Sequence, residues 1–192
     1  RLMTKHDHSV NRPQIFIDNS LSILPITRGS YIIGAMDLYH DFALSDREKV
    51  FDSTDSMPVS SPAFIESIDF NNITSEATAI NSIYVSDILR DFLNEPTLLP
   101  TVNGRMGAGS FFVNCLSGED TSLLVDVSNS QIEIDGGYEG TNSLCLIEAK
   151  SSLSTDFLVR QLYYPFRLWT NKITKPIRPV FLLYSNGTYY LF

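Results

Sequence analysis

The sequence has few of the residues that hold small domains together through disulfides or structural metal ions. Its 192 residues include only two cysteines and three histidines, and their spacing fits no zinc site. Cys115 and Cys145 both lie in apolar runs that read as strands. We therefore expect two reduced core residues, as in a cytoplasmic protein. The alternative is a disulfide between them, if the two runs pair.

Long hydrophobic runs are also missing. No apolar stretch approaches the roughly 18 residues that a membrane-spanning helix needs, and no signal-peptide pattern opens the chain. We therefore expect no membrane partner. With 43% hydrophobic and 19% charged residues, the composition is that of a globular domain with a full core. The chain begins at Arg1, and we expect an N-terminal segment to precede it in the complete protein.

Positive charge is scarce and unevenly placed. The chain has 14 basic and 22 acidic residues, for a net charge of −8, which argues against a protein that coats DNA through charge alone. Residues 157–192 hold five basic residues and no acidic one, so they carry +5 and residues 1–156 carry −13. A basic end on an acidic body favours a local anion-binding face. Uneven scatter of surface charge explains the pattern equally well.

The first third of the chain predicts a small β-rich unit. Residues 51–62 are rich in Ser, Asp and Pro and read as a loop. The predicted domains are therefore an N-terminal β-rich subdomain or extension over 1–62 and a main domain over 63–192. Within the first, 21–26 and 31–33 form a predicted hairpin, and 34–50 continue the strand or form a short helix. His6 and His8 have a spacing that can hold a metal, but a flexible terminal segment is the favoured interpretation.

The main domain predicts an α+β fold. A helix capped by Thr74 or Ser75 should run over 76–94. A second helix should begin near residues 154–156, with a kink or an early end at Pro165. Its sheet-facing side is predicted to hold Leu158, Leu162, Pro165, Phe166 and Trp169, with Arg160, Tyr164 and Arg167 opposite and Gln161 at the boundary. The predicted strands are 110–116, 122–127, one that leads into Asp135, 144–150, and a final hairpin of 180–184 with 188–191. This order favours a mixed, mostly antiparallel sheet flanked by helices.

Three polar residues converge where two of these strands should end. Alternation through Ile132 and Ile134 predicts a strand that reaches Asp135 and ends at the turn-forming pair Gly136-Gly137. On the strand 144–150, Glu148 and Lys150 share one face while Ala149 points to the other. If the two strands form a hairpin, Asp135 lies beside Glu148.

This grouping suits phosphodiester chemistry. Two carboxylates and an ammonium group at one strand tip are costly unless they bind something. Mg²⁺ takes oxygen ligands and usually only one or two protein carboxylates, and a nearby lysine can position the attacking water. The triplet Glu148-Ala149-Lys150 alone is more typical of a solvated, salt-bridged strand end. Asp135 and the glutamine-bearing helix behind it favour the site.

The spacing from Asp135 to Glu148-Ala149-Lys150 resembles the PD-(D/E)xK nuclease superfamily, with Ile134 where the name of that superfamily has proline. The stretches QIEIDGGYEG, LIEAK, RQLYYPFRLW and RPVFLLYSNG are similar to a family of bacterial type II restriction endonucleases. The resemblance implies a restriction-endonuclease-like core and a cytoplasmic, Mg²⁺-dependent endonuclease that cleaves double-stranded DNA. It also allows a homodimer.

The resemblance assigns roles to individual residues. Asp135, Glu148 and the backbone carbonyl of Ala149 would hold Mg²⁺, Lys150 would orient the water, and Gln161 would hold Lys150 or the water. Glu76 is an additional acid by position, although an acid at a helix N-terminus is the simpler interpretation. Arg105, in a glycine-rich stretch over 103–109 that reads as a phosphate-approaching or a strand-entry loop, would contact DNA, as would Arg160 and Arg167. The alternatives are a catalytically inactive DNA-binding or regulatory domain on the same fold, and an interaction module whose acidic body binds a partner other than nucleic acid.

Overall fold

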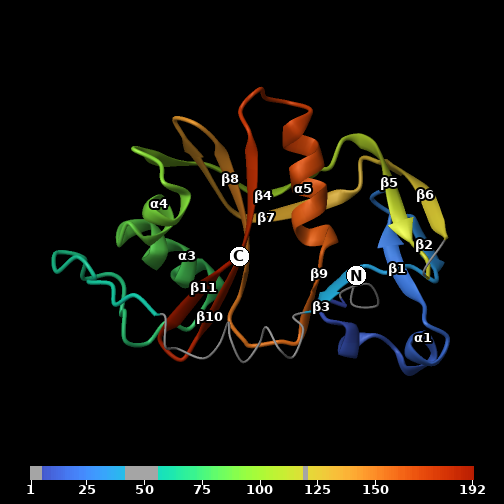
Figure 1. The fold of residues 1–192 in the computed structure, drawn as a ribbon, viewed down its shortest axis with the longest axis horizontal. Helices are drawn as coiled ribbons and strands as arrows, with labels where there is room; N and C mark the ends of the chain where they lie inside the picture. The colour runs from blue at the N-terminus through green and yellow to red at the C-terminus, as the bar shows by residue number, and fades with distance from the viewer. Residues whose placement is uncertain (1–5, 42–55, 119–120) are drawn as a thin grey trace.

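The computed structural model describes residues 6–41, 56–118 and 121–192 (Figure 1). In these residues eleven strands and four α-helices form an α+β fold, as the sequence predicts. The strands are β1 Ser22–Pro25, β2 Tyr31–Gly34, β3 Tyr39–Asp41, β4 Leu98–Gly107, β5 Ser110–Leu116, β6 Ser122–Ser128, β7 Gln131–Gly140, β8 Leu144–Lys150, β9 Asp156–Leu158, β10 Ile177–Ser185 and β11 Thr188–Leu191. The helices are α1 Gln14–Asp18, α3 Glu76–Val85, α4 Ile88–Leu93 and α5 Arg160–Thr170, with a 3-10 turn at Ser9–Asn11. None of the described helices has the length and apolarity needed to cross a membrane.

A five-stranded sheet in the order β11-β10-β8-β7-β4 forms the centre of the fold. Only β8 and β10 run parallel, so the sheet is mixed and mostly antiparallel. The pleat of β8 divides its side chains between two cores. Cys145, Ile147 and Ala149 pack with α3 in one core, whereas Leu144 and Leu146 belong to the core that contains the buried residues of α5. The even-numbered residues of β8 therefore face α5, which places Glu148 and Lys150 on that side.

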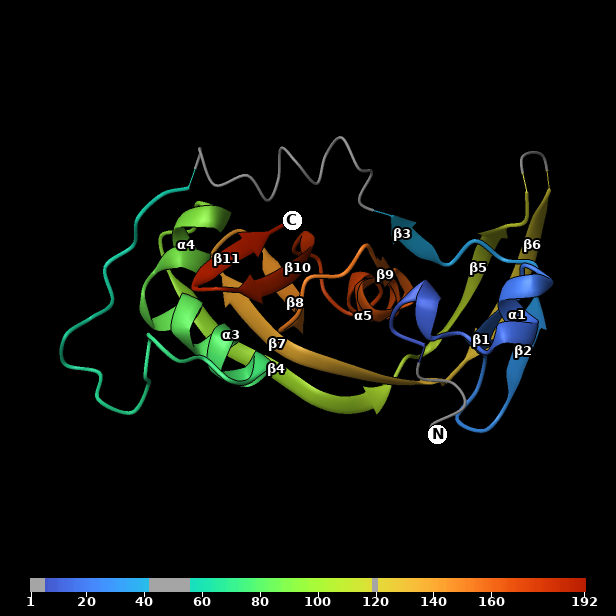
Figure 2. The same cartoon turned by 90° about the horizontal axis from the view of Figure 1, so that it is seen from below.

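Two helices and two of the small sheets lie at opposite ends of the molecule. In both views α3 and α4 occupy one end, the hairpins β1–β2 and β5–β6 occupy the other, and α5 lies between them (Figures 1 and 2). Leu24 of β1 shares a core with Val113, Val127 and Tyr164, and the Tyr164 hydroxyl donates to the Pro25 carbonyl at 3.0 Å. The N-terminal hairpin thus packs on residues far beyond position 62, and the predicted boundary between 1–62 and 63–192 stays a prediction.

Both predicted hairpins are present, as the antiparallel pairs β1–β2 and β10–β11. The predicted strands 110–116 and 122–127 also pair antiparallel, as β5 and β6. Asn186 and Gly187 connect β10 to β11 with φ of 49° and 78°, the left-handed conformation that tight hairpin turns need. Cys115 and Cys145 are buried free thiols, which confirms the prediction of reduced core residues.

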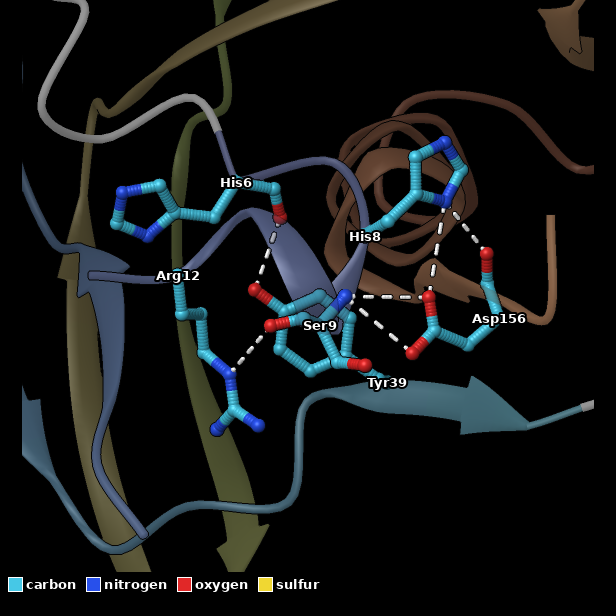
Figure 3. A network of polar contacts seen from close by, with 6 residues as sticks. All are labelled: His6, His8, Ser9, Arg12, Tyr39 and Asp156. Atoms are coloured by element: carbon cyan, nitrogen blue, oxygen red, sulfur yellow. Dashed lines mark hydrogen bonds and ion pairs between the residues drawn. The ribbon is translucent and has the colours of Figure 1, made fainter. Parts of the chain in front are cut away.

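Residues 6–12, the N-terminal segment, are packed against the rest of the fold, so the expectation of a flexible terminus was wrong for them (Figure 3). The Ser9 amide donates to both carboxylate oxygens of the buried Asp156, at 3.1 and 3.2 Å. The His8 ring lies 2.6 Å from the Asp156 carbonyl oxygen. The Tyr39 hydroxyl donates to the His6 carbonyl at 2.8 Å, and Arg12 donates to the Ser9 carbonyl at 3.0 Å.

The predicted turn at Gly136-Gly137 was wrong, because β7 continues through both glycines to Gly140. Close packing against neighbouring residues explains the two glycines instead. A Cβ on Gly136 would lie 3.1 Å from the Ile80 side chain, and one on Gly137 would lie 2.7 Å from the carbonyl oxygen of Val102. The chain turns at residues 141–143, where the buried Glu95 accepts hydrogen bonds from the Ser143 hydroxyl at 2.7 Å and the Asn142 backbone amide at 3.1 Å.

Three other predicted elements differ from the structure. The helix over 76–94 divides into α3 and α4, because Asp87 adopts a left-handed φ of 60°. The stretch 103–109 is no loop, because it is mostly the second half of β4. Residues 154–156 do not cap a helix, because Asp156 begins β9, and α5 starts at Arg160 without a side-chain cap. The predictions over 34–50 and 51–62 fall partly on 42–55, which lie outside the described residues.

The buried face of α5 also differs from the prediction. Tyr164, Pro165 and Leu168 are its buried residues, so Tyr164 faces the core instead of the opposite side. Leu158 lies in β9, ahead of the helix. The helix continues through Pro165 to Thr170, so the predicted early end at Pro165 was wrong.

The buried Glu95 carboxylate predicts how the stability of the fold changes at acid pH. Burial by itself raises the pKa of Glu95, but the hydrogen bonds from Ser143 and Asn142 outweigh it and hold the pKa below the ordinary value. A lowered folded-state pKa stabilises the fold above the ordinary glutamate pKa of about 4.3, and this contribution is lost as pH falls through the lowered value. Glu95→Gln should therefore lower the free energy of unfolding by about 1–2 kcal/mol at pH 7.

Urea unfolding at pH 7 and near pH 3 tests this. The difference between wild type and Glu95→Gln should shrink at the lower pH, where the wild-type carboxylate becomes protonated. The exposed Glu66, replaced by Gln, is the matched control and should show no such loss. An equal difference at both pH values would contradict the role of the Glu95 charge.

Candidate active site

The paired register of β7 and β8 brings Asp135 to Glu148. The two strands are paired from Glu139 with Leu144 to Gly136 with Ile147, so Asp135 and Glu148 are the next residues along them. Beyond this point the strands separate, and an Asp135 oxygen accepts the Ala149 backbone amide at 2.9 Å. Asp135 therefore lies beside Glu148, as the sequence predicts, but at a fork between the two strands instead of next to a turn.

Glu148 and Lys150 form the charged centre of the site. Lys150 donates to an oxygen of Glu148, and Gln161 of α5 donates to that same oxygen. Lys150 Nζ also lies 3.3 Å from the Ala149 carbonyl oxygen. The structure thus brings all four predicted catalytic residues together. The partner of Gln161 is Glu148, where the sequence predicted Lys150 or a water.

The electrostatics of this centre reflect burial of charge. Burial raises the pKa of Glu148 to about 7, against the opposing effect of Lys150. Burial alone would lower the pKa of Lys150, but the Glu148 carboxylate outweighs it and raises that pKa. Burial also raises the pKa of Asp135, although the Ala149 hydrogen bond opposes this. Burial is thus the largest cause of the raised pKa of both acids.

Glu76 joins the same group from α3. Ser75 caps this helix by accepting the Thr78 amide at 3.1 Å, which fixes Glu76 in the first turn. The Glu76 carboxylate accepts the backbone amide of Ser151, the residue after Lys150. Burial raises the pKa of Glu76, and Lys150 and Asp135 act on it with opposite signs. The additional acid predicted from its position therefore lies at the site.

A cavity of about 480 Å³ opens beside Asp135. Its walls come from α3, from β4 where the register with β7 shifts between Pro100 and Gly104, and from Gly136 and Gly137. Asn81, Thr101 and Asn103 supply its polar lining. The sequence gave no sign of this cavity, because a register shift depends on pairing between strands that lie 30 residues apart.

The three predicted DNA-contacting arginines differ in their surroundings. Arg160 lies over the Tyr164 ring at 5.6 Å, its buried Nε has no hydrogen-bond partner in the described part of the chain, and burial lowers its pKa. Arg167 donates to the Phe112 carbonyl at 3.2 Å and to the Tyr163 hydroxyl at 2.9 Å. The half-exposed Arg105 pairs with Glu133 at 3.1 Å. Of the three, Arg160 lies nearest the site, because it directly precedes Gln161. The Glu148 charge also acts on the Arg160 guanidinium and opposes the lowering of its pKa.

The donor atoms can be compared with the needs of Mg²⁺. Within residues 6–41, 56–118 and 121–192, no three His, Cys, Asp or Glu side chains are grouped to hold a metal ion. Mg²⁺ keeps several waters and needs only one or two carboxylates, which Asp135 and Glu148 provide with the Ala149 carbonyl beside them. The buried Gln161 Oε1 has no hydrogen-bond partner among the described residues and can accept from a water at the site. The residues therefore fit Mg²⁺.

Comparisons with known proteins identify sequence families without an assigned activity. Residues 34–192 match a family model described as Domain of unknown function (DUF6997), and residues 1–33 match one described as Domain of unknown function (DUF6996). No curated protein and no solved structure matches the chain. The boundary between the two matched regions falls in β2, although residues from both share one core.

Gly137 gives a test of the packing that holds Asp135. In Gly137→Ala the new Cβ would lie 2.7 Å from both the Cβ and the carbonyl oxygen of Val102, so the backbone of β4 or β7 must move. We expect the free energy of unfolding to fall by about 1–3 kcal/mol in urea titrations. Gly34→Ala is the matched control, because that strand position has nothing within 4 Å of a new Cβ. Equal stability of the two variants would contradict the close approach.

Proposed function

We propose that this chain, which belongs to the DUF6997 family, is a Mg²⁺-dependent endonuclease that hydrolyses phosphodiester bonds of double-stranded DNA. The observation that carries the proposal is the meeting of Asp135, Glu148, Lys150 and Gln161 at one fork between strands. The site resembles that of type II restriction endonucleases of the PD-(D/E)xK superfamily. A bacterial restriction enzyme that works in the cytoplasm, alone or as a homodimer, is the form we propose.

Asp135, Glu148 and the Ala149 carbonyl would hold the metal ion. When bound there, Mg²⁺ supplies Lewis-acid charge that stabilises the phosphate and lowers the pKa of water. Residues of the chain position the two carboxylates. Gln161 fixes one oxygen of Glu148, and this leaves the other for a ligand. The Ala149 amide fixes one oxygen of Asp135 in the same way.

Lys150 provides the positive charge closest to the two carboxylates. Its ammonium group is held between the Glu148 carboxylate and the Ala149 carbonyl, so it is oriented before substrate binds. From there it orients the attacking water and stabilises charge that develops on the phosphate. Its raised pKa keeps it charged and therefore a donor at neutral pH.

The substrate would approach where basic and polar groups surround the site. The buried Nε of Arg160 has no hydrogen-bond partner among the described residues, and the Glu148 charge acts on this guanidinium; such a donor suits a phosphate oxygen. Arg105 and Arg167 lie farther along β4 and α5 and would contact the DNA backbone after exchanging their present partners. The cavity beside Asp135 leaves room for the strand that carries the scissile phosphate.

Replacing the central residues tests the chemistry. Asp135→Ala, Glu148→Ala and Lys150→Ala should each lower the cleavage rate of unmethylated phage or plasmid DNA by about 10²–10³-fold or more, because each removes charge from the reaction centre. Cleavage should require Mg²⁺ and stop in EDTA. Asp126→Ala is the control, because Asp126 lies exposed on β6. Thermal melting verifies that each variant is folded, and full cleavage by folded variants would rule out the assigned roles.

Binding assays separate the alternatives. A gel shift on duplex DNA with Ca²⁺ tests binding while cleavage is suppressed. A protein that binds DNA yet cleaves none with Mg²⁺ or Mn²⁺ is a DNA-binding or regulatory domain. A protein that neither binds nor cleaves DNA is an interaction module, in which the acidic body of residues 1–156 contacts a basic partner.

A further inference from the structure

The cavity beside Asp135 has a buried floor and an exposed polar rim. Its floor is formed by four buried residues of α3 and β7, which are Ile80, Gly136, Gly137 and Tyr138. A Cβ on Gly136 would lie 3.1 Å from both the Ile80 and the Tyr138 side chain, so a larger residue there would take up space at the floor. The rim carries three exposed polar side chains, those of Asn81, Thr101 and Asn103. None of the three makes a side-chain hydrogen bond to another described residue, so all are available to a ligand.

A β-bulge joins this rim to the proposed metal ligand. Between the paired stretches on either side, the single residue Asn103 of β4 lies opposite two residues of β7, Asp135 and Gly136. Bulges of this kind re-aim side chains and are common next to active sites. From α3, Asn81 and Ala77 line the same side of the cavity, because they lie four residues apart on the helix. A molecule in the cavity would thus contact both asparagines and reach Asp135 at one end.

The charges around the cavity favour an uncharged occupant. Among the described residues that line it, Asp135 is the only charged one and none is basic. An acid repels a phosphate unless a cation lies between them, so a phosphate fits only at the Asp135 end.

The polar and apolar groups of the cavity fit a nucleobase. Amide and hydroxyl groups on the rim offer donors and acceptors that match the edges of bases. The apolar floor, with the ring of Tyr138, suits their flat faces. The cavity volume of about 480 Å³ also lies within the roughly 300–1,000 Å³ of small-molecule sites.

We propose that this cavity is a base-binding pocket, which takes the base of a nucleotide that adjoins the scissile phosphate and bonds it through Asn81, Thr101 and Asn103. The inference rests on the proposed function, because the phosphate is placed by Asp135 and its metal ion. A base in an intact duplex is stacked between its neighbours and cannot enter a recess, so this nucleotide must rotate out of the helix. The pocket then gives cleavage a base preference at a position next to the cut.

The sequence preference of cleavage tests the pocket. Sequencing the ends of wild-type digests of phage DNA gives the base preference at every position around the cut. Asn81→Ala and Asn103→Ala should each lower the preference at a position that flanks the cut by about ten-fold, the effect of one lost base contact, and leave the other positions unchanged. Alanine favours a helix more than asparagine does, so Asn81→Ala should not lower the melting temperature. Asn114→Ala, at an exposed position of β5, is the matched control and should keep the wild-type preference.

A cavity-filling variant tests entry of the base. Ala77 is exposed on α3 and lines the cavity, so Ala77→Leu occupies the space while it keeps every polar group and a good helix former. Duplexes with 2-aminopurine at either position that flanks the mapped cut report unstacking, because the fluorescence of this base is quenched while it is stacked. With Ca²⁺ present to suppress cleavage, wild type and Asn114→Ala should raise the fluorescence several-fold at one of the two positions, and Ala77→Leu should not.

The outcomes separate this inference from the proposed function. Wild-type preference in both Asn81→Ala and Asn103→Ala, with a probe that stays quenched at both positions, would overturn the inference; loss of cleavage in Asp135→Ala would then leave the proposed endonuclease intact. A wild-type protein that cuts no DNA with Mg²⁺ or Mn²⁺ would overturn both. An equal change of preference in Asn114→Ala would also overturn the inference, because the effect would then not belong to the cavity.

Discussion

The buried contact between Glu148 and Lys150 constrains the structure around it. A charged pair out of water is costly unless further hydrogen bonds compensate for lost hydration, and Glu148 is only 5% exposed. Gln161 must therefore reach Glu148 from α5, which fixes where that helix begins. Lys150 ends β8, and its neighbour Ser151 donates to Glu76, which fixes the start of α3. Burial raises the pKa of Glu148 to about 7 against the opposing effect of Lys150, so these contacts only partly offset the cost of burying the carboxylate.

The sequence predicted this centre because its chemistry is local. Glu148 and Lys150 lie two apart on a strand, and the pleat alone places them on one face. Asp135 could be added because antiparallel neighbours return the chain to the same place. Gln161 was added because the nucleases that the chain resembles carry this residue type in the helix after the strand. The predicted turn at Gly136-Gly137 was wrong because it rested on the same kind of local reasoning. Glycine pairs favour turns locally, but here their small size admits Ile80 and Val102, which lie far away in sequence.

Contacts between segments that are distant in the sequence could not be predicted from it. Asp156 follows Ser154 and Thr155, and all three are residue types that commonly cap helices. In the structure Asp156 is instead a buried acceptor for Ser9, 147 residues away. Three residues of β9 are too few to show strand alternation, so the element was missed. Tyr164 was placed on the wrong side of α5, because the hairpin β1–β2 covers that side and accepts its hydroxyl. Helical periodicity says which residues share a face, but it does not say which face will be covered.

The N-terminal segment shows why these distant contacts matter for the site. Two sequence families meet within β2, yet the Asp7 carbonyl and the His8 ring from the first lie against β9, the strand that leads into α5. The Asp7 carbonyl contributes one hydrogen bond to Leu158, and a short edge strand left without that bond would expose an amide at the entrance to the helix. The segment therefore contributes through its backbone to the position of α5. A chain that lacked residues 6–12 would lose this contribution, so residues from both matched regions hold the start of α5 in place.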